Sequence, residues 1–538
     1  MKKSILTTVL LLTGLLSIHA QTLGDGLKAL DFERYEYARN VFKSLTSQEP
    51  TNGDNFYYLG QAYFNLLQSD SAFTTYNSGI AADPKNTKNY IGLGELKLNE
   101  NKIAEAKVQF EKALALDKGK DATKSRTVIT IRMIADAMIS TETKLLDEAL
   151  TYAQQAIELD KKNYNLLITT GDVYLEMNNG GEAANNYERA ISIDTNNAKA
   201  YSKVSNIWLR VRNGDAALEA LNKALAKDPN YAPALKNMAE LYFMSKKYEK
   251  AKEYYTKYLQ NSEESNANKI RFAQILFKTK EYEESILKIE EIQRTDKNNP
   301  YLFRMAGVSY YEIAEAKKDT SKYRLGVASM ESFFVKMNPT KVLPSDYEYY
   351  GKLLAKIPGR ENDALQSLNK ALSLDSSRID VYLELAKVNN SSRLKKYDEA
   401  AANIQKYISK KDNPGVSNYA FLAQTYYFGK QWGKADTAYM KVIELKPDYI
   451  PAHYYRAVSN SAINPEAVTT KELYEKFVSL AEPTPEKFKN NLITAYLYLA
   501  RFAIKFEDNN SKAKEYLNKI LVLDQENKDA KDYLKLLK

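Results

Sequence analysis

The sequence has no cysteine and only two histidines, His19 and His453, among its 538 residues. The lack of cysteine excludes disulfides, thiolate metal sites, iron–sulfur clusters, a cysteine nucleophile and the lipid-bearing cysteine of a bacterial lipoprotein. Two histidines cannot form a histidine cluster, so mechanisms that depend on one are excluded as well.

Glycine and proline are also scarce, with 20 and 14 copies, about half their usual combined share. Sandwiches, barrels and disordered linkers use these residues freely, so the composition argues against all three. Aromatic residues make up 11% of the chain and include 41 tyrosines, an apolar content that a disordered chain lacks. The composition indicates a folded, mostly helical protein, too long for one compact core.

The N-terminal segment, residues 1–20, has the pattern of an export signal. Lys2 and Lys3 precede an apolar run over residues 5–18, and Ala20 is a suitable residue before a cleavage site. We expect residues 1–20 to be a signal peptide whose removal lowers the formal net charge of +9 by two. A retained N-terminal anchor is the alternative, although the run is shorter than the roughly 20 residues of a membrane span.

A small residue recurs about every 34 residues, with three breaks in phase, and a fixed period of this length indicates a repeat architecture. The series is Gly26, Gly60 and Gly94; then Ala137, Gly171, Ser205, Ala239, Ala273 and Gly307; then Gly351, Ala386, Ala423 and Ala457. Each lies on an apolar face with helical spacing, as Phe56, Leu59, Gly60 and Tyr63 show. A second small residue follows 12 positions later and a bulky one, such as Tyr76, four beyond that. Each period therefore predicts two antiparallel helices, which prolines often close.

At these positions the sequence resembles the tetratricopeptide repeat (TPR) family. The matching residues are Phe56, Leu59, Gly60, Tyr63, Ala72, Tyr76, Gly79 and Pro84, and again Tyr419, Leu422, Ala423, Tyr426, Ala435, Tyr439 and Pro447. The resemblance implies an all-α, right-handed solenoid of about 14 helix pairs with a C-terminal capping helix, and it leaves the function open.

The repeat phase divides the chain as follows: residues 1–20, signal peptide; 21–118, repeats one to three; 119–126, a polar insertion; 127–318, repeats four to nine; 319–525, repeats nine to 14 with insertions; 526–538, capping helix. Within this scheme we expect residues 315–325 to lengthen the turn inside repeat nine. Residues 357–360 interrupt repeat ten, and residues 482–485 precede a poorly matching last repeat.

No motif predicts catalysis. His453 has polar neighbours, but no Gly-x-Ser-x-Gly element accompanies it, and it falls where other repeats place tyrosine. We expect a packing or surface histidine. Phosphate-binding and dinucleotide-binding glycine motifs are missing, and acidic residues alternate with lysines as on a solvated helix face. The sequence predicts a non-enzymatic protein with no catalytic, cofactor or metal site.

The tyrosines invite a second interpretation as stacking platforms for sugars or nucleic acid. Most occupy repeat positions that predict packing between helices: Tyr63, Tyr90, Tyr174, Tyr201, Tyr242, Tyr347, Tyr382 and Tyr419. The positive charge is spread along the chain, so we expect no nucleic-acid partner and membrane contact only through other proteins.

The first helices of such repeats line the concave face of the solenoid. The resemblance implies a candidate carboxylate clamp over repeats six to eight, where Asn206, Asn237 and Arg271 match the family pattern. Ser202 and Ala267 depart from it, because lysine is expected at both positions. Lys199, Lys203 and Lys236 lie nearby and could supply charged hydrogen bonds to an acidic or C-terminal peptide.

These observations favour an exported interaction scaffold of the bacterial envelope, in the periplasm or at the outer membrane. By resemblance it could belong to a secretion or outer-membrane assembly system. A binder of glycan or peptidoglycan is the alternative that the exposed tyrosines leave open.

Overall fold

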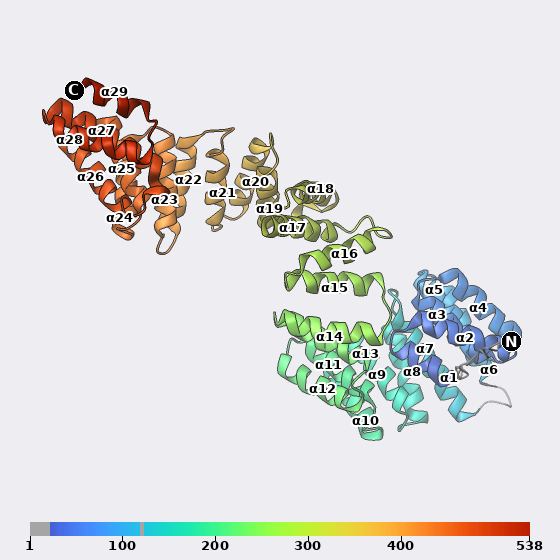
Figure 1. Ribbon diagram of the computed structural model, residues 1–538. Coiled ribbons are helices and arrows are strands. Elements are labelled where there is room, and N and C mark those ends of the chain that lie inside the picture. The colour runs from blue at the N-terminus through green and yellow to red at the C-terminus, as the bar shows by residue number, and fades with distance from the viewer. Residues whose placement is uncertain (1–21, 119–122, 538) are drawn as a thin grey trace, which may run out of the picture. The chain divides into compact units, whose positions relative to one another are not determined.

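The computed structural model describes residues 22–118 and 123–537, and all regular secondary structure in these residues is helical (Figure 1). The expected signal peptide, and residues 119–122 of the expected polar insertion, lie outside the described residues. The contacts divide the chain into two units, residues 1–293 and 294–538.

The described helices of the first unit are α1 (Leu23–Asp31), α2 (Tyr35–Gln48), α3 (Gly53–Asn65), α4 (Ser69–Ala82), α5 (Thr87–Asn99), α6 (Ile103–Leu116), α7 (Lys124–Ser140), α8 (Leu146–Leu159), α9 (Tyr164–Glu176), α10 (Gly180–Ile193), α11 (Ala198–Arg210), α12 (Gly214–Lys227), α13 (Ala232–Met244), α14 (Tyr248–Asn261), α15 (Asn266–Lys278) and α16 (Tyr282–Gln293).

The second unit holds α17 (Pro300–Lys317), α18 (Ser321–Lys336), η1 (Pro339–Lys341), α19 (Pro344–Ala355), α20 (Glu361–Leu374), α21 (Asp380–Asn389), α22 (Tyr397–Lys410), α23 (Val416–Phe428), α24 (Trp432–Leu445), α25 (Ile450–Ile463), α26 (Val468–Ala481), η2 (Pro485–Phe488), α27 (Lys489–Phe506), α28 (Asn510–Leu523) and α29 (Lys528–Leu536); η1 and η2 are 3₁₀ turns.

Successive helices pack in pairs, from α1 with α2 to α27 with α28. These are 14 pairs, and α29 packs on α28 through the buried Ala530. The predicted α-solenoid, its number of repeats and its capping helix are confirmed over the described residues.

The helices of a pair approach closely because a small residue on the first faces a bulky one on the second. A Cβ atom added to Gly60 would lie 2.1 Å from the Tyr76 ring, and one added to Gly171 would lie 2.4 Å from Tyr187. Both tyrosines are fully buried. The facing residues are 16 positions apart, which is the spacing the repeat pattern predicts.

In eight of the described pairs, the turn between the helices uses one residue in the left-handed conformation, seven positions after the small residue. The φ angle is positive at Glu33, Leu67, Asn101, Asn178, Arg212, Lys246, Lys280 and Lys430. A left-handed residue ends a helix abruptly and lets its last carbonyl groups find hydrogen-bond donors. This keeps the turns short, so each second helix returns at once along the first.

Repeat nine corrects one prediction. Residues 315–325 do not form a longer turn, because α17 continues to Lys317 and α18 begins at Ser321. The extra residues are helical since Ile313 and Ala314 bury their side chains in the pair. Gly307 consequently faces Met330, which lies further along the chain than the facing residue of the other repeats.

The other two breaks are connections. Residues 357–360 form the turn between α19 and α20, where Gly359 has a φ of 89°. Residues 482–484 link α26 to η2, which begins at Pro485.

The close approach at Gly60 can be tested by overpacking. We expect Gly60→Leu to lower the free energy of unfolding by about 1–3 kcal/mol, because the new side chain must displace the Tyr76 ring. Gly433→Leu is the matched control, since a Cβ at Gly433 meets nothing within 4 Å. Urea unfolding followed by circular dichroism measures both; equal midpoints would show that the two helices do not meet at Gly60.

Candidate partner-binding groove

First helices form the inner wall of the first unit. Each of α3, α5 and α7 contacts the next first helix along the chain, and α11 contacts α13, whereas the described second helices make no comparable contacts with one another. The repeats are therefore closer together on the first-helix side, and the stack curves toward it.

A cavity of about 600 Å³ opens on this inner wall between α7, α9 and α11. Its lining consists of Asp136, Ile139, Ser140, Lys144, Asp172, Leu175, Glu176, Lys203, Asn206, Leu209 and Arg210. Two of the six residues predicted to bind a partner, Lys203 and Asn206, are among them. The other four predicted residues lie outside this lining.

Three predicted residues bond to the preceding first helix. The Lys203 ammonium lies 2.8 Å from Asp172, and the Asn237 amide donates to Asn206 at 2.7 Å. The Arg271 guanidinium donates two hydrogen bonds to the Glu240 carboxylate.

In these three pairs the residues are 31 positions apart, one repeat less one helical turn. Sequence reasoning missed Asp172 and Glu240 because only the lysines, asparagines and arginine were compared with a family pattern. A search for opposite charges at this spacing would have found both.

Lys199 and Lys236 bond instead to the first repeat of the same unit. The Lys199 ammonium lies 2.7 Å from Asp31, and Lys236 lies 3.0 Å from Glu33. All six predicted binding residues thus have a partner within the chain. The groove presents ion pairs rather than the free cations that the clamp pattern suggested.

Electrostatics at the cavity hold these groups in their charged forms. Burial disfavours the charge on Lys203, but nearby carboxylates, chiefly Asp172, together outweigh it and raise the pKa of Lys203. Burial acts against the charge on Glu176 too, yet hydrogen bonds from Lys144 and Arg210 lower its pKa. The cavity therefore offers charges of both signs.

Glu95 on α5 is a buried carboxyl group that sequence reasoning missed. It is 6% exposed and accepts hydrogen bonds from Gln61 and Ser140, each at 2.6 Å. Burial raises its pKa, the two hydrogen bonds lower it, and the nearby Asp136 raises it further; the net shift is upward. No sequence signal marked Glu95, because it stands among the apolar residues of an unexceptional first helix.

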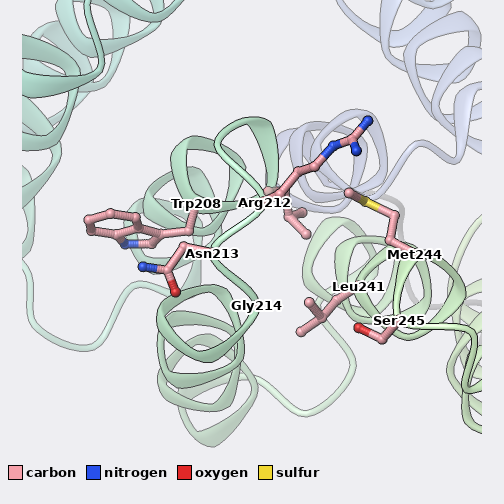
Figure 2. A pocket seen from close by; sticks show the side chains of 8 residues that line it. Trp208, Arg212, Asn213, Gly214, Leu241, Met244 and Ser245 are labelled. Carbon is pink, nitrogen blue, oxygen red and sulfur yellow. The ribbon is translucent and has the colours of Figure 1, made fainter.

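A second, smaller cavity of about 300 Å³ lies at the turn of repeat six beside the end of α13. Figure 2 shows Trp208 and Asn213 on one side of it and Met244 and Ser245 on the other, with Leu241 between them. Arg212 is its one charged lining residue, so the cavity suits an apolar side chain and offers no acid–base pair.

His453 is buried, and its Nε2 lies 2.8 Å from the Pro447 carbonyl, to which it donates. Burial lowers its pKa. The side chain therefore packs, as expected.

The tyrosines divide into two groups. Tyr63, Tyr90, Tyr174, Tyr201, Tyr242 and Tyr419 pack partly exposed against the clusters of the core. The fully buried tyrosines lie on second helices, Tyr76 and Tyr187 among them.

Residues 22–118 and 123–537 contain neither a metal-binding cluster nor a membrane-spanning helix. No group of three or more acidic or histidine side chains is arranged to hold a metal ion. No helix in these ranges is long and apolar enough to cross a membrane.

The stacked helix pairs and their inner groove define a helical-repeat protein. Family models for the tetratricopeptide repeat match residues 87–120, 209–260 and 416–449. Together with the regular repeat period and the 14 helix pairs, they show that the chain belongs to the tetratricopeptide repeat family.

Tetratricopeptide repeat protein 1 of Schizosaccharomyces pombe is 29% identical over 99 residues, which span 16% of this chain and 9% of that protein. Among solved structures, the C-terminal part of a TPR repeat-containing protein from Cytophaga hutchinsonii is 32% identical, covering 49% of this chain and 98% of that one with a TM-score of 0.41. A tetratricopeptide repeat protein from Parabacteroides merdae is 19% identical and covers 49% of this chain and 99% of its own, with a TM-score of 0.31.

The raised pKa of Glu95 predicts a pH dependence. Between its usual pKa and the raised one, the folded chain binds a proton that the unfolded chain does not, so the unfolding free energy falls as pH rises through this window. We expect Glu95→Gln to stabilise the fold by about 1 kcal/mol at about pH 8, because a neutral amide replaces a buried charge, and the gain to shrink as pH falls toward about 5.

Urea unfolding at both pH values measures this difference, with the exposed Glu188→Gln on α10 as the control. A loss of stability in Glu95→Gln at the higher pH would contradict a destabilising buried charge.

Proposed function

We propose that this protein is a non-enzymatic scaffold that binds segments of partner proteins along the first-helix groove of its first unit. The observation that carries the proposal is the cavity of about 600 Å³ between α7, α9 and α11. It combines the apolar Ile139, Leu175 and Leu209 with charged groups of both signs. A peptide segment supplies matching apolar, polar and charged groups, and stacked first helices present them in a row.

We also propose that the protein acts in the bacterial envelope, as part of a secretion or outer-membrane assembly system. The support is the basic start, apolar run and Ala20 of residues 1–20. The lack of cysteine is compatible with an oxidising compartment, because stacking between repeats supplies the core without disulfides.

Site-specific photo-cross-linking in cells of the native host tests the groove. A photoreactive residue placed at Ile139 or Leu209 faces the cavity, whereas Val108 on α6 and Leu287 on α16 are exposed on second helices. We expect one recurrent protein to be captured from Ile139 and Leu209 and not from the two controls. Fractionation of the same cells locates the chain.

Equal capture from all four positions would contradict a groove-bound partner. Sedimentation of the purified chain with cell wall distinguishes the glycan alternative: a scaffold stays in the supernatant, whereas a glycan binder pellets. If the chain pellets with cell wall and no protein is cross-linked from any of the four positions, the glycan-binding alternative replaces the scaffold proposal.

A further inference from the structure

The turn between α1 and α2 reaches the last repeats of its own unit. It carries Asp31, Phe32 and Glu33, which we call the acidic turn, and it contacts residues of α11, α13 and α14 and the residue before α13. These contacts join positions far apart in the sequence, whereas most packing in a helical-repeat protein is between neighbours. In Figure 1 the acidic turn belongs to the blue start of the chain, and α11, α13 and α14 are green.

Phe32 is the apolar centre of this contact. It is 8% exposed and belongs to the buried cluster of repeats six and seven. Its ring meets the Tyr231 ring edge to face, with centroids 5.5 Å apart. Buried aromatic anchors of this kind carry much of the binding energy at protein interfaces.

The two flanking carboxylates each meet one lysine and one tyrosine. Asp31 pairs with Lys199 at 2.7 Å, and burial together with the Asp31 charge raises the pKa of the Tyr231 hydroxyl. Glu33 pairs with Lys236 at 3.0 Å and accepts a hydrogen bond from the Tyr258 hydroxyl. The lysines predicted to recognise a partner's carboxylates therefore bind carboxylates of this chain.

The N-terminus of α2 is also bonded to the later repeats of the unit. Arg34, which precedes α2, makes no capping hydrogen bond through its side chain. Instead the Glu263 carboxylate accepts hydrogen bonds from the backbone N–H groups of Glu36 at 2.5 Å and Tyr37 at 2.6 Å. A side chain from the distant end of the unit thus caps this helix, which a carboxylate does well at a helix N-terminus.

The contact is built so that it can open without unfolding either side. Helix α1 packs on α2 and α3 within its own repeats, and the contact with the far side is made by the acidic turn and the start of α2. The paired charges are about a third exposed, so water can solvate them on release. The corresponding turn of repeat two has Asn65, Leu66 and Leu67, and it lacks both the carboxylates and the aromatic ring.

We propose that Lys199, Tyr231, Lys236, Tyr258 and Glu263 form a docking surface for a partner protein's helix–turn segment that carries an aromatic residue flanked by two carboxylates. The acidic turn of the chain occupies this surface until such a segment displaces it. The inference rests on the proposed function, because it names the chemistry of one partner segment and the contact that competes with it.

The test is peptide binding to the full chain, measured by fluorescence anisotropy. The probe is a labelled peptide with the sequence of residues 22–49, which spans α1 and α2. Its receptor is the variant Asp31→Asn/Phe32→Ala/Glu33→Gln, whose own turn has lost its contacts. We expect this variant to bind the probe at least about tenfold more tightly than the parent chain, in which the acidic turn competes.

Two controls define the surface. A peptide of residues 56–83, from repeat two, should not bind, and adding Lys199→Ser/Lys236→Ser to the receptor should weaken binding of the first probe by about tenfold or more. Hydrogen exchange of the Glu36 and Tyr37 amides, together with thermal melting, verifies that the receptor variant is open and folded.

An open, folded variant that does not bind the probe would overturn the proposal, as would equal binding to parent and variant. Neither result would change the cross-linking expected from Ile139 and Leu209, which line a different part of the groove. Loss of that cross-linking alone would instead contradict the proposed function.

Discussion

The fold depends on the contact between a small residue on each first helix and a bulky side chain on the second helix of the same pair. The Tyr76 ring lies where a Cβ of Gly60 would stand, and Tyr187 fills the same place over Gly171. This contact sets the spacing within a pair, and in eight pairs a left-handed residue seven positions after the small residue sets the turn. Since the pairs of each unit pack mainly on their neighbours, repetition of one local contact builds each unit. The groove is then a consequence of the curvature. The residues that line it do not form this packing contact, so they can differ from repeat to repeat.

Local contacts of this kind produce a regular spacing of small and bulky residues in the sequence. This spacing explains why the repeat number and the capping helix could be predicted. The failure in repeat nine has the same origin. The sequence predicts a longer turn over residues 315–325, but the preceding Ile313 and Ala314 continue the apolar face and extend α17. An insertion that keeps the helical period lengthens both helices of a pair, because their buried faces can then grow together.

The groove was less accessible to prediction. Position in the repeat identified Lys203 and Arg271 as first-helix residues, but not their engagement by Asp172 and Glu240. The two residues of each pair are 31 positions apart, and a comparison with a ligand-binding pattern does not examine that spacing. No sequence pattern identified Glu95 as buried, because a buried carboxyl group needs hydrogen-bond donors such as Gln61 and Ser140, which only the fold brings together. Sequence spacing finds side chains on one face; it does not show which of them are already satisfied.

The long-range contact of the acidic turn is the hardest feature to foresee and the most consequential for binding. Closing a long loop costs only slightly more entropy than closing a shorter one, so a few side chains suffice to hold it. When the acidic turn is bound, the positive charges of Lys199 and Lys236 are already paired. An acidic peptide can bind these lysines only if its carboxylate replaces Asp31 or Glu33. The exchange of one ion pair for another is nearly neutral in free energy, so it discriminates little between acidic segments. The aromatic residue between the two carboxylates then decides which segment binds. Among acidic segments, a partner is then selected by how well its ring replaces Phe32 against Tyr231.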